Sequence, residues 1–409
     1  MNERLTLSGF DNSKLKNEDN NPEEENNRHS KKSINKKLLA TIVISTLIIS
    51  IIIIILLYFL LKEKNDENED KEDDQEEEDE DKEEEEDKDD KPKHLDSFSI
   101  KTTYETDKYN QNVKLMNEDY LNNIIGMEID GQIINHINTS YNFTSPGKHN
   151  VYFLMNIDNL TSFEYMFFIL PNLTSVYFSE EVDSREIVSL SCFFGSSENL
   201  KTIDLSNLNL ENVENMYHTF LSCYSLVSLK FPKTKLPKVR ILSSAFSKCR
   251  SLTSVDLSNF YSENLTYVSN MFSYCDSLIS VDLSNLGVSK SEDFNGMFEG
   301  CVKLRYVNFS NWNTQNVKDV SFMFIGCFEL TSIDLSNFNT IKIKSYDYMF
   351  YECYNLSYVD ISSFGKSAKF EYSYIFYFLP SNGTIKIQNS FYEKIKEYIP
   401  EYWVKIFND

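Results

Sequence analysis

Histidine, tryptophan, glycine and proline are scarce in this chain. Among 409 residues there are 5 histidines, 2 tryptophans, 11 glycines and 8 prolines. The chain has no glycine-rich phosphate loop and no Cys-x-x-Cys pair, and its histidines lie far apart, without metal-ligand spacing. We therefore predict a protein that is not an enzyme, with no catalytic residues, no cofactor and no metal site. The histidines are His29, His94, His136, His149 and His218.

Positive charge is also in deficit. The chain carries 40 lysines and arginines against 63 acidic residues, a net charge of −23. Nucleic-acid binding requires a basic face, so nucleic acid is not an expected partner. Residues 62–93 alone hold 21 acids, 7 lysines and nothing apolar. Such a segment cannot bury enough surface to fold, and we predict a disordered acidic stalk over 62–95. A stalk that collects calcium weakly is the alternative to a plain spacer.

Charge is absent altogether from residues 38–61, which are mostly isoleucine and leucine. A helix of this length spans about 36 Å, enough to cross a bilayer. Five basic residues precede the segment from Arg28 onward, and only Lys62 and Lys64 follow it before the acids. The positive-inside rule then predicts a single-pass type II membrane protein, with a disordered cytosolic tail over 1–37 and extracellular repeats. We expect it in the plasma membrane.

Six of the seven cysteines recur every 26 residues, which indicates a stacked repeat architecture. A leucine opens each copy, and phenylalanines recur at the same period. We predict a buried phenylalanine spine with methionines as packing neighbours. The cysteines are Cys223, Cys249, Cys275, Cys301, Cys327 and Cys353. The leucines are Leu173, Leu200, Leu226, Leu252, Leu278, Leu304, Leu330 and Leu356, and a ninth copy is expected near Ile385. The phenylalanines are Phe167, Phe194, Phe220, Phe246, Phe272, Phe298, Phe324, Phe350 and Phe376.

Each copy alternates apolar and polar residues after its leucine, as in Val255, Asp256 and Leu257. This is typical of half-buried strands, and strands from successive coils predict one parallel sheet with helical or irregular turns opposite. The prolines after Leu226 predict a local irregularity in that copy.

The units Leu278–Leu286 and Asn295–Cys301 resemble the repeats of the BspA-like leucine-rich-repeat surface proteins of bacteria and anaerobic protists. The resemblance covers about residues 165–390. It implies a leucine-rich-repeat solenoid, over 166–389, and a role in adhesion or recognition. In this chain an asparagine falls seven residues after the leucine, and two interpretations stay open: a buried asparagine ladder or caps on the strand turns. These residues are Asn207, Asn259, Asn285, Asn311 and Asn337.

A solenoid exposes its core at both ends unless the ends are covered. Residues 96–165 carry the turn dipeptides Asp130-Gly131 and Pro146-Gly147 between alternating runs, which predicts a cap of antiparallel hairpins. Residues 390–409 are predicted to close the other end with a helix and a strand, and to seal the last coil with Tyr402, Trp403, Val404, Ile406 and Phe407. Ser390 and Glu393 have the spacing of a capping box for that helix.

One column of polar residues runs along the exposed strand face. Three interpretations stay open: a pattern that the repeat simply propagates, a ligand-facing strip, or a calcium strip. The candidate ligand residues are Asp204, Asp256, Asp282, Asn308, Asp334 and Asp360. The cysteines are expected to be free thiols, because stacked equivalent side chains point alike. Candidate N-glycosylation sites all follow residue 61: Asn138, Asn142, Asn159, Asn172, Asn264, Asn308, Asn355 and Asn382.

The sequence is compatible with two functions. The first is a cell-surface protein that recognises an extracellular protein or glycan. The second is a structural component of a glycoprotein coat or endomembrane lumen without a specific ligand.

Overall fold

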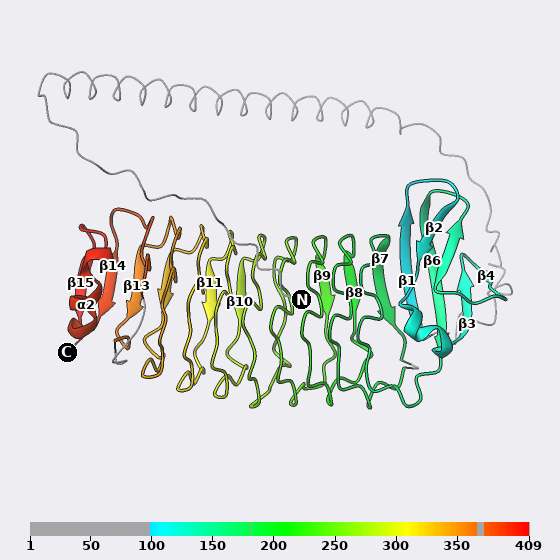
Figure 1. Ribbon diagram of the computed structural model, residues 1–409, viewed down its shortest axis with the longest axis horizontal. Coiled ribbons are helices and arrows are strands. Elements are labelled where there is room, and N and C mark those ends of the chain that lie inside the picture. The colour runs from blue at the N-terminus through cyan, green and yellow to red at the C-terminus, as the bar shows by residue number, and fades with distance from the viewer. Residues whose placement is uncertain (1–98, 181, 366–371, 409) are drawn as a thin grey trace, which may run out of the picture. The chain divides into compact units, whose positions relative to one another are not determined.

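The structure, a computed structural model, describes residues 99–180, 182–365 and 372–408. The predicted cytosolic tail, membrane span and acidic stalk lie outside these residues. No helix within the described ranges is long and apolar enough to cross a membrane. The described residues form a parallel β-solenoid that follows an N-terminal antiparallel sheet (Figure 1).

The N-terminal region is built from antiparallel strands. Its main sheet contains β1 and β6 at the centre and β3 and β4 at the outer edge. Asp130 and Gly131 join β3 to β4 with φ values of 48° and 79°, as expected of a tight hairpin turn. The elements are β1 (Ile100–Thr106), β2 (Gln111–Lys114), η2 (Glu118–Asn123), β3 (Ile124–Ile129), β4 (Gln132–Ile133), β5 (Ser140–Phe143) and β6 (Gly147–Met155).

The second predicted hairpin, at Pro146-Gly147, is wrong. These residues join β5 to β6, but β5 pairs with β2 in a separate two-stranded sheet, and β6 pairs with β1 and β3. The turn therefore carries the chain between two sheets. Turn chemistry fixes a local reversal, whereas the partner of each strand is set by distant residues.

Every coil of the solenoid except the one at Leu252 contributes a strand. Where strands of neighbouring coils are hydrogen-bonded they pair in parallel with a 26-residue register, apart from the first two, whose register is 27 residues. The hidden last copy is present, since Val359 pairs with Ile385. Opposite the strands the chain forms irregular turns. The strands are β7 (Leu173–Phe178), β8 (Thr202–Asp204), β9 (Ser228–Lys230), β10 (Ser280–Asp282), β11 (Tyr306–Asn308), β12 (Ser332–Asp334), β13 (Tyr358–Ile361) and β14 (Thr384–Ile387).

The strand side is not one continuous sheet, in contrast to the prediction. It is divided into β4-β3-β6-β1-β7-β8-β9, β10-β11 and β12-β13-β14-β15, in which the last strand is β15 (Val404–Phe407). The copy that opens at Leu226 forms β9 despite its prolines, because Pro232 lies beyond the last strand residue, Lys230. The next copy, at Leu252, is regular in sequence but forms no strand.

Both divisions follow a coil with phenylalanine five residues after its leucine. In each case that ring meets a phenylalanine of the next coil edge to face. Phe231 lies 4.8 Å from Phe260, and Phe309 lies 5.7 Å from Phe338, between ring centroids. Six of the other coils carry leucine or isoleucine at the first of these positions. We attribute the divisions to these ring pairs, because an extra ring in a packed core forces backbone shifts.

The first coil shows that one such ring is not sufficient. Phe178 holds the same position as Phe231, yet β7 and β8 remain paired. Its ring stacks on Phe163 and Phe193, and the following coil offers Leu208 where the divided coils have phenylalanine. The division therefore depends on the pair of rings.

Opposite the strands, the predicted spine is confirmed and unbroken. The nine phenylalanine rings of the spine are buried, and successive centroids lie 5.2–5.8 Å apart from Phe167 to Phe376. Backbone hydrogen bonds cross every coil interface here, for example from Phe272 N to Met297 O at 2.9 Å. The six repeat cysteines are free and buried. Each thiol donates to a phenylalanine carbonyl 29 residues earlier, at 3.0–3.2 Å.

The C-terminal segment differs from its prediction in two ways. Helix α2 (Asn389–Ile395) begins after Gln388 and has no side-chain cap, so the capping box at Ser390 is wrong. Burial of Phe391 against Tyr346, at 5.6 Å, sets the position of the helix instead. A short η3 helix (Lys396–Tyr398) follows.

The last strand does not seal the core. Strand β15 (Val404–Phe407) pairs in parallel with β14 and adds one more strand at the edge of the sheet. Trp403 is the member of this predicted seal that is buried. The exposed members are Tyr402, Val404, Ile406 and Phe407. They are exposed because no further layer covers this sheet edge in the described residues.

Candidate functional site on the strand face

We use the term central column for the six predicted ligand residues on the strand face. The register places Asp282 opposite Asn308 and Asp334 opposite Asp360. Asp204 pairs with Lys230 in the same way. Asp256 lies in the coil that forms no strand. Parallel pairing directs paired side chains to one face, so the column exists within each sheet segment.

Every member of the column also has a local role. Its side-chain Oδ1 accepts a hydrogen bond from the backbone N–H of the serine two residues later, at 2.8–3.1 Å. Aspartate and asparagine favour this turn because their side chains can imitate a backbone acceptor. The recurrence of Asp-x-Ser is thus explained by turn formation at the end of each strand. This supports the interpretation that the repeat propagates the pattern, and it leaves the outer carboxylate oxygen free for other contacts.

Charge is not uniform along the column. Lys230 pairs with Asp204 at 2.9 Å, and Lys386 pairs with Asp360 at 3.3 Å. Between these two ion pairs, no lysine or arginine of the described chain bridges Asp256, Asp282 or Asp334. The column therefore has neutralised ends and an acidic middle.

Hydrogen bonds lower the pKa of two carboxylates in the acidic middle. The backbone N–H of Ser258 lowers the pKa of Asp256. Hydrogen bonds from Ser284, and a weaker one from Asn308, lower the pKa of Asp282. Both carboxylates are consequently charged at neutral pH and well below it.

The division between β11 and β12 leaves a polar pocket on this face. Its volume is about 400 Å³, and it contains Asn308 and Asp334 of the central column. Ser332 and Ser336 add hydroxyl groups, and the ring of Tyr306 is 61% exposed at the rim. Carboxylate, amide and hydroxyl groups beside an exposed aromatic ring suit a polar ligand with several hydroxyl or amide groups.

The structure distinguishes the two interpretations of the asparagines that lie seven residues after the repeat leucines. Each of the five side-chain amides donates to a backbone carbonyl of the preceding coil, at 3.0–3.2 Å. They form a ladder, but at the half-exposed end of the strands and not in the core. Asn337 bonds to Phe309, whereas its equivalent Asn311 bonds to Ser284, which is one position later in its coil. The shift does not mark a division, because Asn207 bonds to the equivalent Phe178 between the paired strands β7 and β8, whereas Asn259 at the first division bonds to Pro232 at the unshifted position.

The eight N-glycosylation candidates are all exposed or half-buried. Two of them use their amide nitrogen within the protein: Asn172 donates to Glu105 O and Asn355 to Phe328 O, both at 2.8 Å. Asn308 contributes to the hydrogen bonding of Asp282 and lines the pocket. A glycan at Asn308 would therefore fill the pocket.

The described ranges contain no group of three or more His, Cys, Asp or Glu side chains that could hold a metal ion. Within the column, Asp204 and Asp360 are paired with lysines, and Asp282 lies opposite an asparagine. The calcium interpretation gains no support from this geometry.

Sequence reasoning missed a second column. Lys238, Lys290 and Lys342 each extend their Nζ to an asparagine Oδ1 26 residues earlier. These positions alternate lysine and asparagine from coil to coil, a 52-residue pattern that could have been found. The pocket itself could not, because it depends on how two rings pack across a coil interface.

Parallel coils, an asparagine ladder and a buried apolar spine define a β-solenoid of the leucine-rich-repeat type. The family model described as "Mycoplasma protein of unknown function, DUF285" matches residues 137–231, 188–307 and 269–383. These matches together span more than half of the sequence, and the chain belongs to this family.

No curated protein matches the chain. Among solved structures, the crystal structure of a TLR13-ssRNA13 complex is similar at 15% identity with a TM-score of 0.30. The alignment covers 59% of this chain and 38% of that one, so this chain spans little more than a third of the other's length.

Proposed function

We propose that this protein is a membrane-anchored, BspA-like cell-surface protein that recognises an extracellular protein or glycan on its strand face. Residues 38–61 would anchor it in the plasma membrane as a single-pass type II protein. Residues 62–95 would hold the solenoid away from the bilayer, and the role is binding, without catalysis. The observation that carries the proposal is the pocket between β11 and β12, where Asn308 and Asp334 converge.

The acidic middle of the column supports the same reading. Three carboxylates without ion pairs on one face are unfavourable, because like charges on neighbouring strands repel. Their turn role could be filled by asparagine, as Asn308 shows with its 3.1 Å bond to Ser310. Retention of charge at the other positions favours a ligand that uses it. A coat component without a specific ligand remains the second candidate, and it requires no such charge.

A charge-neutral variant tests the proposal. Full-length protein would be probed on an array of glycans and on an array of extracellular proteins. Asp256→Asn, Asp282→Asn and Asp334→Asn together keep each turn acceptor and remove three charges. We expect the wild-type protein to bind at least one glycan or protein on these arrays. The triple variant should bind it at least tenfold more weakly, with an unchanged melting temperature.

The matched control carries Glu211→Gln, Glu263→Gln and Glu397→Gln, which remove three exposed charges elsewhere. It should bind as the wild type does. Equal binding by the two triple variants, or no binding on either array, would favour the coat alternative.

Location is tested separately. Protease added to intact cells should cut within residues 62–93 and release the folded part, since extended acidic segments are readily cleaved. Release only after permeabilisation would refute the plasma-membrane orientation.

A further inference from the structure

The strand face does not stop at the first coil. Strand β1 pairs with both β6 and β7, so the N-terminal sheet and the solenoid share one sheet. The central column continues through it, strand by strand, in direct register. This row consists of Lys230, Asp204, Tyr177, Lys101, Tyr152, Glu128 and Ile133. Six strand intervals of about 4.8 Å give it a length of roughly 29 Å.

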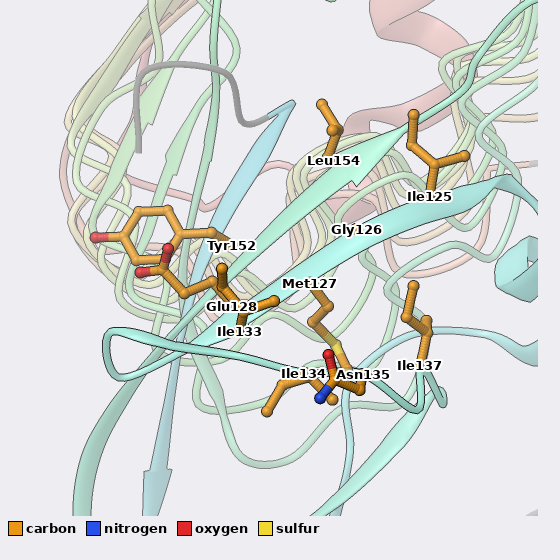
Figure 2. Close-up of a pocket in the computed structure, with 10 residues that line it drawn as sticks. All are labelled: Ile125, Gly126, Met127, Glu128, Ile133, Ile134, Asn135, Ile137, Tyr152 and Leu154. Carbon is orange, nitrogen blue, oxygen red and sulfur yellow. The ribbon is translucent and has the colours of Figure 1, made fainter. Parts of the chain in front are cut away.

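The outer end of this row opens into an apolar pocket of about 310 Å³ (Figure 2). Strands β3, β4 and β6 supply its walls. Aliphatic side chains dominate, among them Ile125, Ile133, Ile137 and Leu154. A cavity of this size and lining accepts an apolar group of a few carbon atoms more readily than a polar one.

Glu128 is the one acidic residue among the ten that line this pocket. Only 6% of the residue is exposed, but its carboxylate oxygens are not among the fully buried polar atoms without a partner, so they reach solvent. Its register partners are Tyr152 and Ile133, which flank it in Figure 2. A solvent-accessible carboxylate at the edge of an apolar wall favours a cation that enters from outside the described chain.

The nearest cation of the row is already engaged. Lys101 lies over the ring of Tyr152, 5.3 Å from its centroid. The occupant must therefore bring an apolar stem and a positive head. Lysine and arginine side chains have this form, because their methylene chains pack on apolar walls while the head remains charged.

The backbone beside the pocket favours a peptide as the carrier. Strand β4 is the edge of the seven-stranded sheet, and both its residues are exposed. Exposed edges accept an additional extended strand through main-chain hydrogen bonds, with alternate side chains entering neighbouring pockets.

We propose that this pocket binds a lysine or arginine side chain of an extended segment of a partner protein, which pairs with β4 and lies along the row. The proposal rests on the recognition function above and narrows its partner class to a polypeptide at this end. A glycan bound in the pocket between β11 and β12 would leave it untouched.

The test uses full-length protein labelled at isoleucine δ1-methyl groups. The probe is an acetylated, amidated five-residue peptide, Val-Thr-Lys-Val-Thr, with a single charge so that the acidic segment 62–93 contributes little. We expect saturable methyl shifts at Ile125, Ile133 and Ile137, and at least tenfold weaker binding when norleucine replaces the probe's lysine. A probe with arginine should bind like the lysine probe.

Glu128→Gln should abolish the difference between the lysine and norleucine probes and leave the melting temperature unchanged, because the carboxylate reaches solvent. Glu118→Gln, an exposed control in the same region, should change neither. A lower melting temperature for Glu128→Gln with unchanged discrimination would assign the carboxylate a structural role and overturn the proposal. Equally tight binding of n-butylamine would refute a peptide partner. If the peptide does not bind while the arrays show binding, the proposal for this pocket is refuted, but the proposed function of the strand face is not.

Discussion

The phenylalanine side and the strand side of the solenoid differ in continuity. On the phenylalanine side, stacked rings and backbone hydrogen bonds cross every coil interface, and a thiol hydrogen bond crosses each interface from Phe194 to Phe350. On the strand side, the sheet is divided twice. A stack needs only one unbroken side to keep its 26-residue spacing. The other side is then free to open where large rings meet, and the candidate ligand pocket lies at one of these openings.

The largest expected effect comes from a charge on the continuous side. Cys301→Asp would place a carboxylate where the thiol donates to Phe272 O at 3.1 Å, with no cation nearby. We expect the free energy of unfolding to fall by about 3–5 kcal/mol in urea titrations. Ser280→Asp, on the exposed strand face, should cost less than about 1 kcal/mol. Equal losses would contradict the assignment of the core to the phenylalanine side.

Truncations compare the two sides directly. Phe272→Ala removes a fully buried ring with partners on both sides at 5.2 and 5.6 Å, and should cost about 3–5 kcal/mol. Val255→Ala removes a half-buried side chain from the coil without a strand, and should cost about 1 kcal/mol. Thermal and urea unfolding of both variants would measure the difference. A larger loss of stability for Val255→Ala than for Phe272→Ala would contradict the assignment of the core to the phenylalanine side.

The thiol column predicts a pH dependence. Burial raises the pKa of Cys223 to about 12 from its usual 9.0. The folded state then keeps a proton that the unfolded chain releases, so the stabilisation is complete below pH 9 and is lost as pH rises toward 12. Between pH 8 and pH 10 the wild type should lose about 1.4 kcal/mol more than Cys223→Ala. Equal pH slopes would show that the thiol is accessible.

The divisions can be moved by single substitutions. Phe309→Leu should let β11 and β12 pair, and it should slow hydrogen exchange at residues 331–334 while changing stability by less than about 1.5 kcal/mol. Leu335→Phe places a ring opposite Phe364 of the next coil, as in the two natural divisions. It should open a new division between β12 and β13. If neither substitution alters exchange, the ring pairs are not the cause.

The repeat made the phenylalanine side predictable from sequence. A fixed period forces equivalent residues into equivalent places, so Phe246 and Cys249 could be assigned to the core without any model of the turns. The register of Val359 with Ile385 followed by the same reasoning.

Features that arise between coils or between domains were not predictable in this way. The pairing of Lys101 with Tyr177 joins residues 76 positions apart, with no repeat to align them. The turn role of Asp282 depends on a backbone angle that alternation alone does not specify. Burial of Phe391 shifted the start of α2 away from the local capping signal.

Residue-resolved hydrogen exchange of the wild-type protein tests the central claim most directly, namely that one side holds the stack and the other is open. We expect the amides of Phe246, Phe272, Phe298 and Phe324 to exchange only through global unfolding, because each donates a backbone hydrogen bond across a coil interface at 2.9–3.0 Å. We expect much faster exchange at residues 253–256 and 331–334, beside the two divisions. Uniform protection around every coil would contradict this claim.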